Sequence, residues 1–185
     1  MKNLDPYGHL MHYGMMSNKK VNICQPGFDA SCSLCCGSHE GGMSGDDLEA
    51  LYLVRGETNR DHIDRPDVIP APPAERTPCP WIGRLNPLPG NGLIGCLIYH
   101  DPSKGGKSWE KFILNTCRSF SCQARDTLDE QEIIYAARLC RDWFYYSLII
   151  HLPVTLRALM KSHPDPDDVT PAEQESLRIY LRSQM

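Results

Sequence analysis

The stretch LDEQEIIYAARLCRDWFYYSLIIH, residues 128–151, carries the most regular pattern of apolar residues in this chain. Its apolar residues recur at intervals of four, three, four and four, which is the period of an amphipathic helix. These residues are Ile133, Ala137, Cys140, Phe144 and Leu148. Thr127 and Glu130 form a capping-box pattern in front of the stretch. The sequence therefore predicts one long helix over residues 128–151, with its apolar stripe turned toward a core.

The chain beyond this stretch keeps a helical character. Pro153 restarts or kinks the helix, because proline lacks the amide hydrogen that a helix interior needs. Thr170, Pro171 and Glu173 give the capping signature of a final helix. The aromatic run of residues 143–146 predicts core packing, and Cys140 on the apolar stripe predicts a small core residue.

The chain before this stretch is less regular. Ser44 and Asp47 predict a capped short helix over residues 44–56. Residues 66–92 hold eight of the fifteen prolines, which excludes a regular helix and predicts a loop that wraps the core. Residues 92–100 are apolar and rich in β-forming residues, so they predict a short strand.

These elements predict the fold class and its division along the chain. We expect a mainly α fold, a small α+β single domain, in which irregular metal-braced loops and a short strand or hairpin pack on the long helix. Residues 1–23 form an N-terminal segment, residues 24–125 a cysteine-cluster region, and residues 126–185 a helical region packed on it.

Composition narrows the function classes. The net charge is −4, which gives no global basic field for nucleic acid or for an anionic membrane. No segment offers about 18 uninterrupted apolar residues, and the first residues lack the apolar core of a signal peptide. We therefore expect a soluble cytoplasmic protein that binds neither nucleic acid nor membrane.

The chain has nine cysteines, far above ordinary usage. Thiols in a reducing compartment favour metal, cluster or redox chemistry over structural disulfides. Cys32 and Cys35 have the CxxC spacing that presents two sulfurs to one ion from a tight turn, and Cys36 beside them points elsewhere. With Cys140 assigned to the core, eight candidate metal ligands remain: Cys24, Cys32, Cys35, Cys36, Cys79, Cys96, Cys117 and Cys122.

Four elements of the sequence together resemble a known family. They are FDASCSLCC at residues 28–36, CPWI at 79–82, GCLIY at 95–99 and CRSFSC at 117–122. Their order resembles that of the YkgJ-type cysteine-cluster proteins, the CxxCxxCC family of zinc- or iron-chelating domains. The resemblance covers residues 24–122 and implies binding of zinc or of an iron–sulfur cluster, for instance 4Fe-4S. The family also takes in the more remote flagellin lysine N-methylases.

The chain departs from the family pattern in two places. The family's first cysteine falls at Asp29, whereas the available thiol is Cys24, which is separated from Cys32 by seven residues. Either Cys24 replaces it through a longer loop or Asp29 is an oxygen ligand, and we favour Cys24 because thiolate is the softer donor. The interval between Tyr99 and Cys117 is also longer than in the family.

Three functions are compatible with these patterns. The first is a metalloprotein with an iron–sulfur cluster, zinc or one of each, acting in redox or group-transfer chemistry. The second is an enzyme in which the cluster positions a substrate, although no glycine-rich nucleotide signature accompanies the cysteines. The third is a structural-zinc module whose helical C-terminus binds a protein partner. His39 is interpreted as an exposed loop residue rather than as an additional ligand.

Overall fold

The structure is a computed structural model, and it describes residues 21–37, 39, 43–52, 82–85, 93–96 and 122–185. Within these residues the chain is mainly helical, with a small antiparallel sheet, which confirms the coarse prediction of a helix-rich α+β fold. No helix in the described ranges has the length and apolar character needed to cross a membrane.

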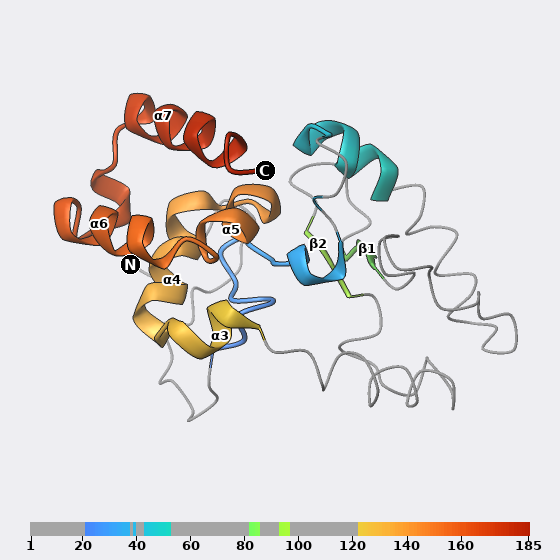
Figure 1. The fold of residues 1–185 in the computed structure, drawn as a ribbon, viewed down its shortest axis with the longest axis horizontal. Coiled ribbons are helices and arrows are strands. Elements are labelled where there is room, and N and C mark those ends of the chain that lie inside the picture. Colours follow the sequence, from blue (N-terminus) through green and yellow to red (C-terminus); the bar gives the residue numbers. More distant parts are fainter. Residues whose placement is uncertain (1–20, 38, 40–42, 53–81, 86–92, 97–121) are drawn as a thin grey trace, which may run out of the picture.

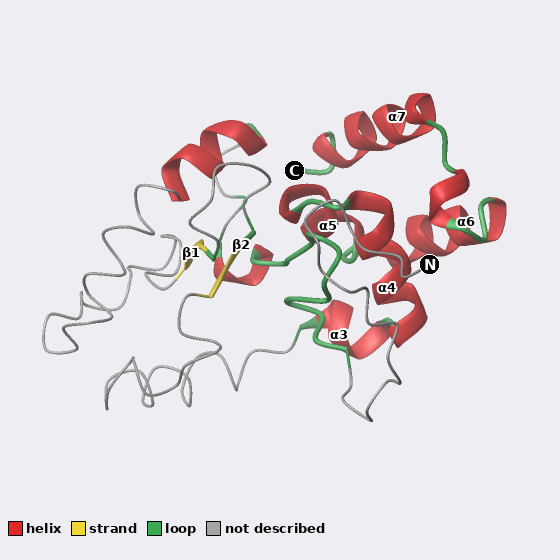
Figure 2. Ribbon diagram, turned by 180° about the vertical axis from the view of Figure 1, so that it is seen from behind, coloured by secondary structure: helices red, strands yellow, loops and turns green. Residues whose placement is uncertain are grey.

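The C-terminal part consists of consecutive helices. They are α3 (Gln123–Thr127), α4 (Glu130–Cys140), α5 (Trp143–Ile149), α6 (Pro153–Ser162), the 3-10 turn η4 (Pro166–Asp168) and α7 (Pro171–Arg182). Figure 1 shows α4 to α7 gathered on one side of the molecule, and Figure 2 shows the same group from behind. The helical residues 45–52 lie on the other side, beside the sheet.

The predicted single helix over residues 128–151 is wrong, because the chain forms α4 and α5 with a break between them. Arg141 takes a left-handed conformation with φ 49°, which ends α4. Asp142 then caps α5 by accepting a hydrogen bond from the Tyr145 amide at 2.7 Å. The apolar stripe continues through the break, since Ile133 and Leu148 are both buried. The periodicity identified the buried face but did not detect the break.

The helix starts follow local capping chemistry. The box predicted at Thr127 and Glu130 is wrong by two residues, because Asp129 and Glu132 form it instead, with bonds of 2.9 Å in both directions. The predicted restart at Pro153 is confirmed as the first residue of α6. The box of Thr170 and Glu173 is confirmed at the start of α7.

The sheet is a pair of three-residue strands. β2 (Ile94–Cys96) confirms the strand predicted within residues 92–100, and β1 (Ile82–Arg84) lies in the proline-rich stretch that was predicted to be a loop. The two strands are antiparallel, with Ile82 opposite Cys96 and Arg84 opposite Ile94. A Cβ at Gly95 would lie 2.9 Å from Leu85 Cδ1, so a larger residue there would require the Leu85 side chain to shift. The paired residues 82–84 and 94–96 contain no proline, which explains why strands form within and beside a proline-rich stretch.

Helix α5 is the centre of the core. All of its side chains are buried, and it contacts α4, α6 and α7. The predicted core role of the aromatic residues 143–146 is confirmed, as is the burial of Cys140. Tyr146 donates a hydrogen bond of 2.8 Å to the carbonyl oxygen of Ile23, so α5 also holds the segment that carries the first cysteines.

Candidate metal centre

A tight turn joins the first two candidate ligands. Phe28 and Asp29 both have positive φ, 56° and 55°, as the two central residues of a type I′ turn do. The amide of Ala30 bonds the Gly27 carbonyl at 3.0 Å, and the amide of Cys32 bonds the Cys24 carbonyl at 2.9 Å. Cys24 is therefore opposite Cys32 across the turn, whereas Asp29 is exposed at its tip.

The next two candidate ligands lie on a single 3-10 turn, η1 (Leu34–Cys36). The amide of Cys36 bonds the Ser33 carbonyl, and the amide of Gly37 bonds the Leu34 carbonyl, both at 2.9 Å. Gly37 has φ 82°, a left-handed conformation that glycine adopts without steric cost. Cys35 is exposed here and Cys36 is half-buried, so the adjacent thiols occupy different environments.

The electrostatics of the described thiols indicate that three of them are neighbours. Burial, together with the smaller effect of the charges of Cys24 and Cys35, raises the pKa of Cys32 to about 12. The Cys32 side chain is only 8% exposed. By contrast, a hydrogen bond from Cys36 lowers the pKa of Cys35 to about 7. One thiol of this group thus resists ionisation and another ionises near neutral pH.

The remaining candidate ligands come from separate elements. Cys96 is the last residue of β2, and Cys122 is the N-cap of α3. Burial raises the pKa of the Tyr146 hydroxyl, and the charges of Cys32, Cys24, Cys140 and Cys122 add to this effect. The structure therefore brings Cys122 into the surroundings of the same tyrosine as Cys24 and Cys32. Cys79 and Cys117 lie outside the described residues.

Three buried serines form hydrogen bonds next to the cysteine turn, the turn between Cys24 and Cys32. This network was not predicted from the sequence. Ser147 of α5 donates to the Trp143 carbonyl at 2.7 Å, and its oxygen accepts from the Ser33 amide at 3.4 Å. Ser31 donates to the carbonyl of Ile94 at 2.8 Å, which ties the cysteine segment to β2. All three serines have no exposed surface. The only sequence signal was two serines flanking Cys32.

His39 is buried, so its interpretation as an exposed loop histidine is wrong. Its side chain is 9% exposed and packs against Phe144 and Trp143, with ring centroids 4.6 Å and 5.3 Å away. Burial lowers its pKa to about 4, so the imidazole is neutral at physiological pH. The ring serves the packing of the cysteine segment on α5.

No group of three or more histidine, cysteine, aspartate or glutamate side chains within the described residues is placed to hold a metal ion. Comparison with protein families, with curated proteins and with solved structures gives no match for this chain. The resemblance to the YkgJ-type proteins thus rests on the order and spacing of the cysteines.

Proposed function

We propose that this protein binds zinc or an iron–sulfur cluster through the thiols of its cysteine-rich region. The observation that carries the proposal is the turn that sets Cys24 opposite Cys32, together with the effect of the Cys24 and Cys35 charges on the ionisation of Cys32. Cysteine thiols brought together from one turn are the donor type that zinc and iron–sulfur centres use.

The chemistry of the donors fits such a centre. A buried thiol whose pKa is about 12 stays protonated at neutral pH unless a cation offsets the thiolate charge. Ser33, between Cys32 and η1, has a buried Oγ without a hydrogen-bond partner among the described residues. A hydroxyl in that position is a donor suited to a metal-bound sulfur.

Completion of the site requires thiols from other segments. Cys122 shares the surroundings of Tyr146 with Cys24 and Cys32, which makes it the next candidate ligand. Cys36, Cys79, Cys96 and Cys117 complete the proposed set of eight. Bound zinc would cross-link these segments, and an iron–sulfur cluster would in addition carry electrons or contact a substrate.

The arrangement also bears on whether Cys24 or Asp29 supplies the first ligand. Asp29 is exposed at the tip of the turn, while Cys24 lies across from Cys32. We therefore assign the role to Cys24. The alternative function is a structural-zinc module that binds a protein partner without catalysis, and the finding of an iron–sulfur cluster would exclude this alternative.

The test is anaerobic purification of the full chain, followed by metal and sulfide analysis and visible absorption spectroscopy. An iron–sulfur protein is brown, with sulfur-to-iron absorption bands, whereas a zinc protein is colourless with stoichiometric zinc. Cys24→Ser and Cys36→Ser should each lower the bound metal by at least half. Cys140→Ala and Asp29→Asn are the matched controls, and both should retain it.

A folded protein that purifies without metal and takes up neither zinc nor a reconstituted cluster would contradict the proposal. Retention of full metal content by Cys24→Ser together with loss in Asp29→Asn would instead reverse the assignment of the first ligand. Circular dichroism of each variant separates loss of metal from loss of fold.

A further inference from the structure

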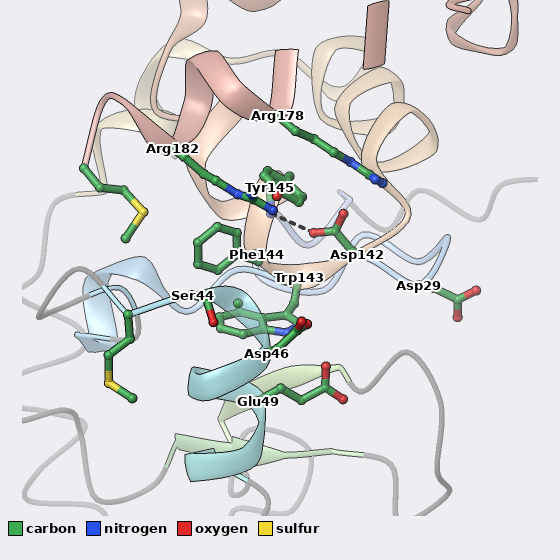
Figure 3. Close-up of a pocket in the computed structure, with 13 residues that line it drawn as sticks. Asp29, Ser44, Asp46, Glu49, Asp142, Trp143, Phe144, Tyr145, Arg178 and Arg182 are labelled. Carbon is green, nitrogen blue, oxygen red and sulfur yellow. Dashed lines mark hydrogen bonds between the residues drawn. The ribbon is translucent and has the colours of Figure 1, made fainter. Parts of the chain in front are cut away.

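A cavity of about 760 Å³ lies between α5, α7 and the start of the helical residues 45–52, and Asp29 from the tip of the turn between Cys24 and Cys32 also lines it. Figure 3 shows side chains of these three elements around it. Cavities of this volume are typical of small-molecule sites. Its opposite walls carry opposite charges.

The wall formed by α7 is cationic. Arg178 and Arg182 are one helical turn apart, and both extend over the ring of Tyr145, with guanidinium carbons 5.1 Å and 5.4 Å from the ring centroid. Arg182 also forms a hydrogen bond with the Tyr145 side chain, and a guanidinium has five N–H donors, so both arginines retain donors for a ligand. Neither arginine forms an ion pair with a carboxylate in the described part of the chain.

The wall formed by the helical residues 45–52 is acidic. Asp46 and Glu49 both line the cavity (Figure 3). Glu49 lies 3.6 Å from a guanidinium nitrogen of Arg84, which offsets part of its charge. Asp46 is exposed and forms no ion pair with any residue that the structure describes. Asp46 is therefore the carboxylate that remains available on this wall.

The surface between the two walls is mainly aromatic, and the carboxylate of Asp142, on which the charge of Arg178 acts, lines it as well (Figure 3). The buried residues Trp143 and Phe144 line it, and Met43 and Met185 contribute flexible apolar side chains. Phe144 is held by close packing, because a Cβ at Gly45 would lie only 3.3 Å from its ring. An apolar segment of a ligand would meet these side chains.

We propose that this cavity binds a small zwitterionic molecule whose anionic and cationic groups are separated by an apolar spacer. The anionic group pairs with Arg178 and Arg182, the cationic group pairs with Asp46, and the spacer contacts Trp143 and Phe144. Each charged end alone would leave one wall without a partner, so the site favours a ligand that carries both. The proposal is independent of metal binding at the cysteines.

The test uses a series of ω-amino carboxylates, from glycine through 4-aminobutanoate to 6-aminohexanoate, with hexanoate and hexylammonium as singly charged controls. Binding to the full chain is followed by NMR chemical shifts of the Trp143 indole and by calorimetry. We expect affinity to pass through an optimum along the series, and the best member to bind about tenfold more tightly than either control.

Two variants assign the charged groups. Arg182→Gln should weaken the best zwitterion about tenfold and leave hexylammonium unaffected, while Asp46→Asn should weaken it similarly and leave hexanoate unaffected. Arg125→Gln and Asp126→Asn are the control variants, because they alter an exposed ion pair of 3.5 Å on α3, outside the cavity. Both should leave the affinities for the best zwitterion, for hexanoate and for hexylammonium unchanged. Binding of no zwitterion, equal binding of the controls, or indifference to both cavity variants would overturn the proposal.

Discussion

His39 stacks on Phe144 and donates a hydrogen bond from its Nε2 to the carbonyl oxygen of the same residue, at 3.1 Å. The carbonyl can only accept, so Nε2 carries the proton of the neutral ring. This contact fixes the end of the cysteine segment to the start of α5. It also makes folding depend on the protonation of one histidine.

Acidification should destabilise the protein through His39. Its pKa falls from 6.5 to about 4 on folding because the ring is buried. The unfolded chain therefore binds the extra proton first, and stability is lost as the pH falls from 6.5 to 4, by up to about 3 kcal/mol. Urea unfolding of wild type and His39→Phe across this range measures the effect. An identical pH slope in the two proteins would show that His39 does not contribute.

Asp142 should act in the opposite direction over the same pH range. Burial raises its pKa from 3.8 to about 6, so its contribution to stability is present below pH 3.8 and is lost as the pH rises through 6. Asp142→Asn retains the acceptor for the Tyr145 amide. Its stability relative to wild type should rise with pH between 4 and 6 and then level off.

Tyr146→Phe should loosen the cysteine segment. The substitution removes the donor to the buried Ile23 carbonyl and leaves the ring in place. Loss of one buried hydrogen bond costs about 1–3 kcal/mol. Hydrogen exchange should increase for the Cys32 amide, which lies in the same segment. Tyr180→Phe, at an exposed position on α7, serves as the control, and equal effects of the two substitutions would refute the proposed link.

The break between α4 and α5 predicts a difference between two substitutions at Arg141. Both glycine and alanine remove the ion pair of 2.9 Å with Asp167, but only glycine adopts positive φ without steric cost. Arg141→Gly should therefore be about 1 kcal/mol more stable than Arg141→Ala. Thermal unfolding compares them. If alanine were the more stable, residue 141 would have to be helical, and α4 and α5 would be continuous.

Periodicity and capping chemistry predicted much of the C-terminal half because both are local. Pro153 and the box of Thr170 and Glu173 begin helices as expected. The break at Arg141 escaped prediction because α4 and α5 keep the same buried face. In the sequence, only the adjacent polar residues Arg141 and Asp142 indicated the break. The structure shows that Asp142 is the N-cap of α5, since it accepts a hydrogen bond from the Tyr145 amide.

The candidate centre was predictable as a list of thiols but not as an arrangement. Spacing identified Cys32, Cys35 and Cys36, whereas the position of Cys24 depends on a turn through Phe28 and Asp29. Neither of these two residues is the glycine that a type I′ turn normally favours, so the turn could not be predicted from the sequence. Burial of His39 depends on contacts with residues more than 100 positions away, which no local pattern encodes.

Burial of every side chain in α5 has a consequence for mutational tolerance. A helix at the surface has at least one side on which polar replacements cost little, and α7 is of this kind, since Leu181 is its buried residue. α5 has no such side. In a library of variants covering residues 143–149, charged replacements should destabilise the protein at every position. A half-exposed helix would instead tolerate such replacements at the positions of its exposed face, which recur every three or four residues.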